Sequence, residues 1–403
     1  MVINGKEFNS LSKEDYKVRD FDKAYCELLK DILKNGELFE NRTGIDTLSV
    51  EGVNFKLDLG KEFPLLESKK VLLKNALSEM LWIYQAQTND VSWLRERGNN
   101  IWNEWEVDSD GIYRIYESTT ENYDKDKEVN VYDLDGNIII GMKAKSNIEG
   151  KNIKAAKFYG KEYAGTIGTA YGYIINKYKR LDYVLNALKS NPHDRRMLIS
   201  LWQDADLRTA VLPSCVWSSE WKVKNGKLNS YIHQRSADVP LGLPFNISQY
   251  AILQSLLAKV SGLEVGNMNY SIMDAHVYVN QVDGIKKQLE RYNKMNFYEE
   301  MIKNSNQKYI LRLYNSKRKY IEFLEKTDNK EELQRAKEDL LLLELMITKK
   351  KPKLELADKK DFYEFSNQVN NDKEYLKENV TGNEDIKVLN YSSAPFIKMP
   401  VAQ

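Results

Sequence analysis

The stretch that decides the fold runs from residue 217 to residue 246 and reads WSSEWKVKNGKLNSYIHQRSADVPLGLPFN. Two segments with a strand-like pattern, 217–223 and 228–234, flank Asn225-Gly226, which is the strongest short signal for a tight β-hairpin. A long apolar segment follows from 244 to 263 and predicts a buried helix. A β-hairpin that leads directly into a buried helix indicates an α+β protein.

Further elements are predicted on both sides of this stretch. Apolar residues repeat at helical spacing over 21–35, 72–84 and 181–190, while strand-like patterns cover 47–59 and 196–202. These elements are predicted to form one α+β domain over the whole chain, with two segments of different character inserted into it.

The two inserted segments are polar. Residues 113–160 are rich in Lys, Asp and Asn, and Asp135-Gly136 lies between short β-like runs, which predicts a small insertion with a β-hairpin. Residues 292–351 carry two helical stripes separated by Thr327-Asp328-Asn329, a sequence that suits a helix N-cap. We expect a charged helical hairpin here, at the periphery and outside the site.

The composition disfavours several classes of protein. Of the 403 residues, 42% are hydrophobic and 30% charged, as in ordinary globular proteins. Lys and Arg number 60 against 59 Asp and Glu, which disfavours a nucleic-acid-binding protein. Two cysteines and three histidines argue against a disulfide framework and leave little material for a metal site. Without a signal peptide or an apolar run long enough to span a membrane, a cytoplasmic protein is expected.

Cys215 lies between Leu212-Pro213 and the first strand of the hairpin. A lone cysteine in such a place is more often a buried structural residue than a reactive one. As a nucleophile it would need positive charge nearby, because the thiolate is the reactive form. Arg195, Arg196 and Arg235 are available for this role if folding brings them close. The residues alone leave both interpretations open.

The segment that follows the hairpin carries polar groups suited to an anionic ligand. Arg235 and Ser236 suit a phosphate, the first through forked charge-assisted bonds and the second through its hydroxyl. Asp238 and Asn246 have the groups needed to bind the polar edges of a heterocycle. The alternative is a solvated loop with helix caps.

Three other features point to a site. Glu79 falls inside the apolar arc of its predicted helix, where a carboxylate is expensive unless it is paired or used, although a glutamate at the helix edge would explain it too. Trp102 and Trp105 suit either a core or an aromatic platform. Residues 396–403 are unusually apolar for a chain end, which suggests that they dock rather than fray.

Taken together, these segments resemble thymidylate synthases of the folate-dependent type that use a cysteine nucleophile. No single motif carries the resemblance, but the ordered set is specific and covers most of the chain outside the two insertions. The matching segments are Asn41-Arg42-Thr43-Gly44 with Thr47-Leu48-Ser49, Phe63-Pro64-Leu65-Leu66 with Lys69-Lys70, Glu79-Met80-Leu81-Trp82, Ile101-Trp102-Asn103-Glu104-Trp105, Gly168-Thr169-Ala170-Tyr171-Gly172, Asp194-Arg195-Arg196, Cys215, 234–246, Asp274-Ala275-His276-Val277-Tyr278 and Pro400-Val401-Ala402.

The resemblance implies a large mixed β-sheet packed with helices, and a homodimer. It implies that Cys215 adds to C6 of deoxyuridine monophosphate (dUMP), and that Glu79, Tyr171 and Asn246 are the other catalytic residues. For dUMP binding it implies Arg42, Gln234, Arg235, Ser236, Asp238, Asn246, His276 and Tyr278, with Arg195 and Arg196 reaching the phosphate from the partner subunit. For the co-substrate 5,10-methylenetetrahydrofolate it implies Lys69, Ile101, Trp102, Trp105, Asp238, Gly242 and Ala402, and it implies no metal.

The chain departs from the family pattern at several positions. Most members have Pro-Cys-His at the nucleophile, whereas this chain has Ser214-Cys215-Val216. A subgroup similar to certain Bacillus and phage synthases carries Val there, so the missing His does not argue against synthase activity. Glu220 stands in place of a usual Gln and Gln403 in place of an apolar residue.

Two other functions fit parts of the pattern. A hydroxymethylase acting on dUMP, or less readily on dCMP, shares the fold but lets water attack the transferred carbon. Enzymes acting on dCMP generally place Asp where this chain has Asn246, and the retained Pro400-Val401-Ala402 tail favours a closed, dry site and methyl transfer. The second alternative is an inactive scaffold that binds protein or RNA through the helical insertion.

Overall fold

A six-stranded sheet forms the centre of the protein, with the strand order β3-β4-β12-β11-β10-β9. Strands β11 and β12 run parallel, while the other neighbours are antiparallel, so the sheet is mixed as predicted. The strands are β3 (Glu37–Phe39), β4 (Thr47–Asp58), β9 (Leu198–Ser200), β10 (Val216–Lys224), β11 (Lys227–Asp238) and β12 (Glu264–Tyr278). The computed structural model describes residues 16–41, 43–117, 122–366 and 385–401, and the backbone of 2–3 and 6–7.

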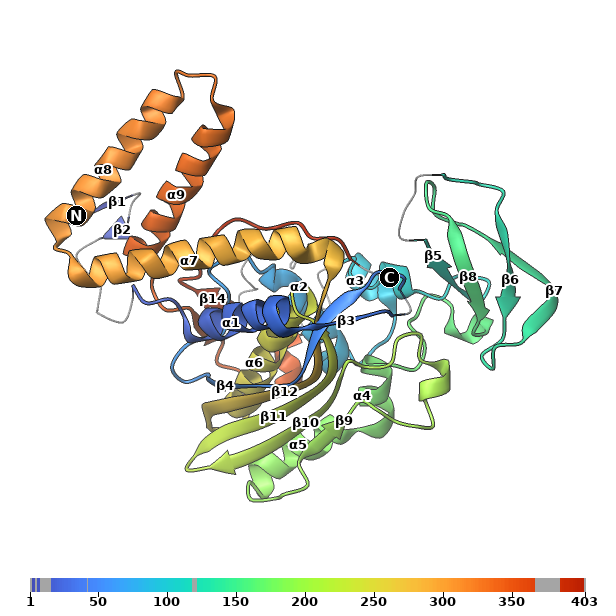
Figure 1. Ribbon diagram of the computed structural model, residues 1–403. Helices are drawn as coiled ribbons and strands as arrows, with labels where there is room; N and C mark the ends of the chain where they lie inside the picture. The colour runs from blue at the N-terminus through green and yellow to red at the C-terminus, as the bar shows by residue number, and fades with distance from the viewer. Residues whose placement is uncertain are drawn as a thin grey trace.

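Helices cover one face of this sheet (Figure 1). The predicted buried helix is α6 (Gly242–Val260), which packs against β11 and β12 and against α2 (Leu73–Met80). A helix that is apolar on nearly all sides must be buried on all sides, and the position of α6 between the sheet and α2 meets that requirement. The helix predicted over 72–84 is α2 followed by a π-helical turn, η2 (Leu81–Gln85).

Outside the two insertions, the described chain contains the following further elements. They are β1 (Val2–Ile3), β2 (Lys6–Glu7), α1 (Asp20–Asn35), α3 (Val91–Arg95), η3 (Asn103–Trp105), η4 (Lys161–Tyr163), α4 (Gly172–Tyr178), α5 (Arg180–Ser190), η5 (Leu207–Thr209), η6 (Val279–Gln281), α7 (Val282–Asn304), β13 (Lys353–Leu356), η7 (Phe362–Ser366) and β14 (Ile386–Leu389). Strands β13 and β14 pair as a separate two-stranded sheet.

The insertion predicted over 113–160 contains a separate four-stranded sheet that projects to one side of the body (Figure 1). Its strands are β5 (Ile112–Tyr116), β6 (Glu128–Tyr132), β7 (Ile138–Lys145) and β8 (Ile153–Phe158). Val131, Ile153 and Ala156 belong to its own small core. Asp135-Gly136 lies in the turn between β6 and β7, and the φ of +87° at Gly136 requires glycine-like freedom.

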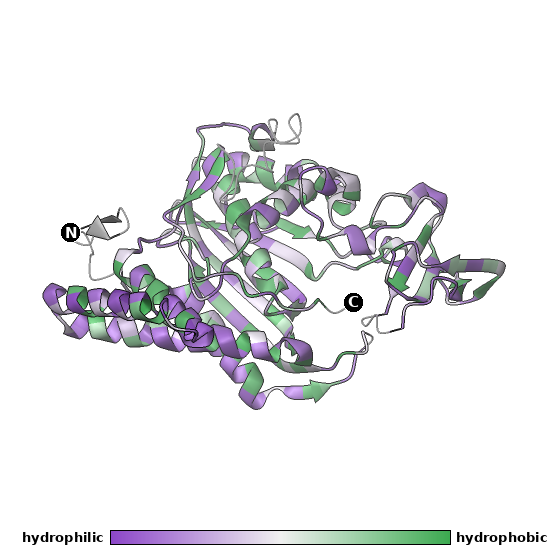
Figure 2. Ribbon diagram, turned by 90° about the horizontal axis from the view of Figure 1, so that it is seen from above, coloured by the Kyte–Doolittle hydropathy of each residue, from purple (hydrophilic) through white to green (hydrophobic). Residues whose placement is uncertain are grey.

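The second insertion contains a helical hairpin of α8 (Gln307–Leu324) and α9 (Lys330–Thr348), which projects from the other side of the body (Figure 1). Hydrophilic residues predominate along it (Figure 2). Asn329 is the N-cap of α9, because its side chain accepts a hydrogen bond from the backbone N–H of Glu332.

The end of α9 joins the main core. Its buried residues Leu342, Leu343, Leu345, Met346 and Ile347 pack in the same cluster as the central sheet.

A buried ion pair follows directly after α9. Lys349 Nζ lies 2.8 Å from Glu67 Oε2, and Arg19 Nε lies 3.4 Å from the other carboxylate oxygen. All three side chains are at most 3% exposed. The hairpin is therefore anchored in the body at its C-terminal end, although its tip is exposed.

Within the described part of the chain, no helix has the length and apolar character needed to cross a membrane.

Candidate functional site

The site forms where the loop before β10 meets the end of β11. Val216 pairs with Gln234 in the antiparallel register, and the N–H of Arg235 donates to the carbonyl oxygen of Cys215 at 2.9 Å. Side chains alternate along β11, so buried Gln234 and half-buried Arg235 point to opposite faces of the sheet. The pairing thus brings Cys215 beside the polar end of β11.

Arg235 holds the loop that carries Cys215. Its Nη2 lies 3.7 Å from the sulfur and donates to the carbonyl oxygen of Pro213 at 2.8 Å, while Nε donates to that of Ser214 at 3.2 Å. A fixed guanidinium beside a sulfur favours the thiolate, which is the nucleophilic form. This geometry favours the nucleophile interpretation of Cys215 over the structural one.

Tyr171 contacts the same cysteine from the loop before α4. Its hydroxyl accepts a hydrogen bond of 3.2 Å from the backbone N–H of Cys215. Burial, followed by the charge of Cys215, raises the pKa of Tyr171 well above its usual value, so the phenol is neutral. Tyr171 has a φ of +49°, which is strained for a residue with a side chain and is a common feature of functional sites.

Glu79 lies buried on α2 at the same site. Trp102 Nε1 donates to its Oε1 at 2.8 Å, and Gln249 Nε2 donates to its Oε2. Burial raises the pKa of Glu79 to about 7, with the two hydrogen bonds opposing the shift. A carboxyl group with this pKa can gain and release protons near neutral pH.

Asn246, in the first turns of α6, stands between two glutamines. Its Oδ1 accepts a hydrogen bond of 3.2 Å from Gln234 Nε2, and its Nδ2 lies 3.5 Å from Gln249 Oε1. Tyr270 on β12 donates to Gln234 Oε1 at 2.5 Å. Sequence reasoning did not identify Gln249 as part of the site; its one signal was a polar residue within an apolar helix.

The parallel pairing of β11 with β12 brings a second polar group to the C-terminal ends of these two strands. Ser236 pairs with Asp274, and Asp238 pairs with His276. The Ser236 hydroxyl donates to Asp274 Oδ2 at 2.9 Å, and His276 Nδ1 lies 3.0 Å from the same oxygen. The ring of Tyr278 meets that of His276 edge-on, with centroids 5.3 Å apart.

Aromatic rings border the site on the side of η3. The ring of Trp102 lies 5.5 Å from that of Trp105 and 5.1 Å from that of Tyr171, measured between centroids. Ile101, directly before them, is exposed. These residues form an apolar wall beside Glu79.

Lys69 is buried, and the half-buried Asp238 is close enough for its charge to act on it. Burial lowers the pKa of Lys69 to about 8, with the charge of Asp238 opposing the shift, and Lys69 Nζ donates to the carbonyl oxygen of Pro240. Burial raises the pKa of Asp238, although Leu241 N–H donates to its Oδ1 at 3.1 Å just before Gly242 starts α6.

Gln281 links the chain's last described residues to Asp238. Its Nε2 donates to Asp238 Oδ2 at 3.2 Å and to the carbonyl oxygen of Pro400 at 3.1 Å. Ile397 and Met399 are buried, so this segment docks on the body. Gln281 is a second residue of this region that sequence reasoning did not identify.

Two of the predicted residues stand apart from this arrangement, and two others are not among the described residues. Arg195 and Arg196 are exposed in the loop before β9, at the edge of the sheet, where Arg196 Nε donates to Asp194 at 3.0 Å. Arg42 and Ala402 lie outside the described residues. Across the described ranges, no group of three or more His, Cys, Asp or Glu side chains is gathered so as to hold a metal ion.

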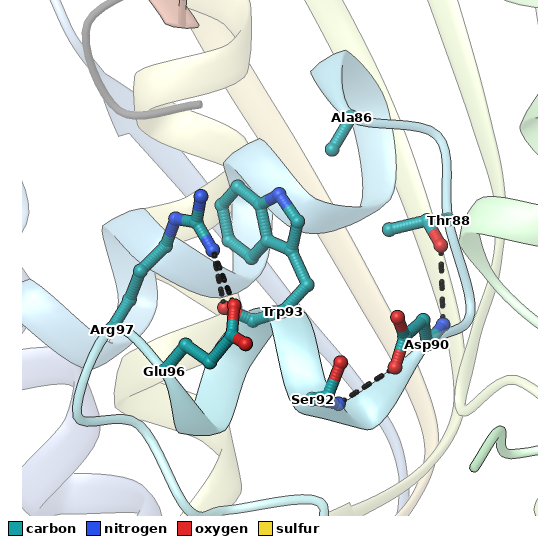
Figure 3. Close-up of a pocket in the computed structure, with 7 residues that line it drawn as sticks. All are labelled: Ala86, Thr88, Asp90, Ser92, Trp93, Glu96 and Arg97. Carbon is teal, nitrogen blue, oxygen red and sulfur yellow. Dashed lines mark hydrogen bonds and ion pairs between the residues drawn. The ribbon is translucent and has the colours of Figure 1, made fainter. Parts of the chain in front are cut away.

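A separate pocket of about 380 Å³ lies beside α3 (Figure 3). Its lining includes Trp93 and Arg97, whose guanidinium lies 4.0 Å from the ring centroid of Trp93. None of the residues predicted for the site lines this pocket.

Comparisons with known proteins agree with the geometry. The sequence model of the family described as "Thymidylate synthase" matches residues 23–322. A thymidylate synthase of Clostridium beijerinckii is 37% identical, with 68% of this chain and 83% of that protein covered, and one of Bacillus phage phi3T is 34% identical, with 67% and 84% covered. The solved structure of thermostable thymidylate synthase A from Bacillus subtilis aligns with a TM-score of 0.59 and 26% identity, covering 95% of this chain and 99% of that one.

Proposed function

The chain belongs to the thymidylate synthase family, and we propose that it converts dUMP to dTMP with 5,10-methylenetetrahydrofolate as donor of the carbon and of the hydride. The observation that carries the proposal is the Arg235 guanidinium 3.7 Å from the Cys215 sulfur, in a site that also holds buried Glu79 and half-buried Asn246. The Cys215 thiol alone would not indicate this chemistry. Together with a guanidinium, a carboxyl group that can carry a proton and a side-chain amide, it does.

The chemistry begins with the bond that Cys215 forms. Its thiolate adds to C6 of the pyrimidine, which makes C5 nucleophilic toward the one-carbon unit. Glu79 and the neutral phenol of Tyr171 then serve proton transfers, including removal of the proton from C5. The folate supplies a methylene carbon and one hydride and leaves as dihydrofolate, while the C6–S bond breaks and returns the thiolate.

We assign the nucleotide's parts to separate residues. Arg235 and Ser236, with Arg42, hold the phosphate through charge-assisted hydrogen bonds. His276 and Tyr278 bind the sugar hydroxyl, and Asn246 with Gln234 binds the uracil edge. What supports this division is the register of β11 and β12, in which Ser236, Asp238 and His276 lie together at the C-terminal ends of the two strands.

The folate fits the aromatic side of the site. Trp102, Trp105 and Ile101 offer flat apolar surface for its ring system. Asp238, Lys69 and the backbone near Gly242 offer the polar groups. The docked segment around Pro400, continued by Ala402, would cover the bound molecule and exclude water, and the Gln281 bridge to Pro400 supports this placement.

A homodimer is part of the proposal. Trp217 and Tyr231 are exposed on the sheet face, and both rings contact that of His233. By the two-residue period of β11, Arg235 points to this same face. An exposed aromatic group next to a phosphate-binding arginine suits a two-fold interface through which Arg195 and Arg196 reach the partner's phosphate. Cys26 and Cys215 are not joined in a disulfide, which suits a reducing compartment such as the cytoplasm.

The test is the product formed from dUMP and 5,10-methylenetetrahydrofolate. We expect a nucleotide heavier than dUMP by one CH2 group, because a methyl group replaces a hydrogen, and one dihydrofolate per turnover. A hydroxymethyl product without dihydrofolate would contradict methyl transfer, and the absence of any product from folded dimer would contradict the enzymatic assignment.

A further inference from the structure

Gln249 connects two groups that the proposed mechanism uses for different tasks. Its Nε2 donates to the Glu79 carboxylate, and its Oε1 accepts a hydrogen bond of 3.5 Å from Asn246 Nδ2. On the other side of Asn246, Gln234 Nε2 donates to Oδ1 at 3.2 Å. Gln249 is 5% exposed, so its hydrogen bonds have little competition from water and are costly to leave unmade.

The direction of these hydrogen bonds is fixed at both ends. Gln234 Nε2 also donates to the backbone carbonyl oxygen of Ser236 at 2.9 Å, and that oxygen can only accept. The ionised carboxylate of Glu79 likewise only accepts, so Gln249 must turn Nε2 toward it and Oε1 toward Asn246. Asn246 is therefore held with Oδ1 toward Gln234 and Nδ2 toward Gln249.

In this orientation Asn246 keeps one N–H and one lone pair for a ligand, because an amide has two of each. Uracil offers an acceptor at O4 and an N–H donor at N3, which complement this pair. Cytosine offers an amino group and an unprotonated ring nitrogen, so the Asn246 amide would have to turn over. The turned amide would place nitrogen against nitrogen at Gln234 and oxygen against oxygen at Gln249.

We propose that Gln249 is a specificity-determining positioning residue that ties the Asn246 amide to the Glu79 carboxylate and so holds the site in its uracil-binding form. The inference rests on the proposed function, since it takes Asn246 as the residue that meets the base. Val216, the residue after Cys215, has no polar side-chain group to make such a link. The connection between the base and Glu79 therefore runs through α6.

The same contact affects the ionisation of Glu79. Burial raises the pKa of Glu79 to about 7, and the hydrogen bonds from Trp102 and Gln249 oppose that rise. The other titratable or charged groups around it are Tyr171 and, beside Tyr171, Cys215 and Arg235. Loss of one hydrogen bond to a charged group should raise the pKa of Glu79 further, by about one to two pH units.

The variant that tests the inference is Gln249→Met, which fills the space without an amide. We would measure kcat/KM and Kd for dUMP and for dCMP across the pH range in which Glu79 titrates. We expect kcat/KM for dUMP to fall about tenfold or more, and the dUMP/dCMP ratio to fall by a similar factor. The limb of the pH profile that reports the ionisation of Glu79 should move to higher pH.

Gln254 offers a matched control on the same helix. It is also buried, its Nε2 donates to the carbonyl oxygen of Leu228 at 2.8 Å, and its Oε1 accepts from Ser230 at 2.6 Å. Gln254→Met should lower stability comparably and leave the dUMP/dCMP ratio and the pH limb unchanged. If it lowers the ratio as much as Gln249→Met does, the effect is one of general stability and the inference is wrong.

Gln249→Glu is a second variant of nearly the same shape, in case Gln249→Met does not fold. It can donate to Glu79 only while the two carboxyl groups share a proton, but it accepts from Asn246 Nδ2 in either state, so the dUMP/dCMP ratio should be retained while the pH limb moves to higher pH. A dUMP/dCMP ratio that stays at the wild-type value in Gln249→Met, or that falls in Gln249→Glu, overturns the inference. Failure of the wild type to convert dUMP would instead overturn the proposed function.

Discussion

The Nη2 of Arg235 lies 3.7 Å from the sulfur of Cys215, and the same side chain donates to the carbonyl oxygens of the two residues before the cysteine. Arg235, which we propose binds the phosphate, thus also positions Cys215, the proposed nucleophile. A nucleotide whose phosphate engages Arg235 would meet a thiol held by the same side chain.

Cys215→Ala or Cys215→Ser should abolish turnover and leave nucleotide binding largely intact, because the fold holds the loop through backbone carbonyl groups. Turnover and calorimetric dUMP binding would be measured side by side. Cys26→Ala is the matched control, since Cys26 is buried between Asp22 and Ser68. Near-normal turnover in the Cys215 variants would remove the covalent mechanism.

Asn246→Asp should weaken the use of dUMP and improve the handling of dCMP. A carboxylate has no N–H to offer O4 of uracil, and each mismatched buried hydrogen bond should cost about 1–3 kcal/mol. Steady-state kinetics with both nucleotides give the preference directly. An unchanged dUMP/dCMP preference would count against the assignment of Asn246 to the base.

Glu79→Gln should inactivate the enzyme yet stabilise it at neutral and higher pH. Burial raises the folded-state pKa of Glu79 to about 7, above the ordinary value of 4.5, so the wild type loses stability as pH rises from 4.5 through 7. The neutral amide of the variant escapes this loss. Its free energy of unfolding should therefore exceed that of the wild type by up to about 3 kcal/mol above pH 7, and this gain should be absent at pH 4. Urea unfolding of both proteins at several pH values measures the difference, and a pH-independent difference would contradict the burial argument.

Subunit mixing should reveal a shared site. An inactive Cys215→Ala protein mixed with an inactive Arg195→Ala/Arg196→Ala protein should regain activity, because each mixed dimer has one site with both lesions and one with neither. Random reassortment of equal amounts gives about a quarter of all sites intact. If mass spectrometry confirms subunit exchange and no activity returns, the arginines act within their own subunit.

The tip of the helical hairpin should be dispensable, whereas its anchor should not. Replacing 318–336 with a short Gly/Ser linker should preserve dUMP binding, because the exposed tip has little to lose. Lys349→Met should destabilise the protein by about 3 kcal/mol, since it breaks a buried ion pair on one side. Exposed Lys350→Met is the control in thermal and urea unfolding. Loss of dUMP binding in a dimeric tip variant would place the hairpin in the site.

The elements with strong local signals were predictable from sequence. The turn at Asn225-Gly226 and the apolar run from 244 placed β10, β11 and α6 within a few residues. The π-helical turn at Leu81–Gln85 was not predicted, because its periodicity differs little from that of an α-helix over five residues. The strand expected over 196–202 is only Leu198–Ser200, because just three residues pair with β10.

The site was predictable where residues stand close together in sequence, as in 234–246. Gln249 was not, because its partner Glu79 lies 170 residues away and periodicity carries no information about such pairs. The Gln281 contact with Pro400 spans 119 residues and was hidden for the same reason. Lys349 belongs to a run of three lysines that resembles a solvated surface, yet its side chain is fully buried.

The buried pair between Lys349 and Glu67 has a consequence for how this lineage can change. A descendant that lost the whole hairpin would also lose Lys349. The Glu67 carboxylate would then stay in the core with Arg19 as its remaining partner in the ion-pair group. Because such a group is costly to leave incomplete, the deletion and a substitution at position 67 would have to arise together. Shortening from the tip meets no such barrier. Comparison of close relatives should therefore show hairpins of many lengths whose final turn and acidic partner are inherited as a unit.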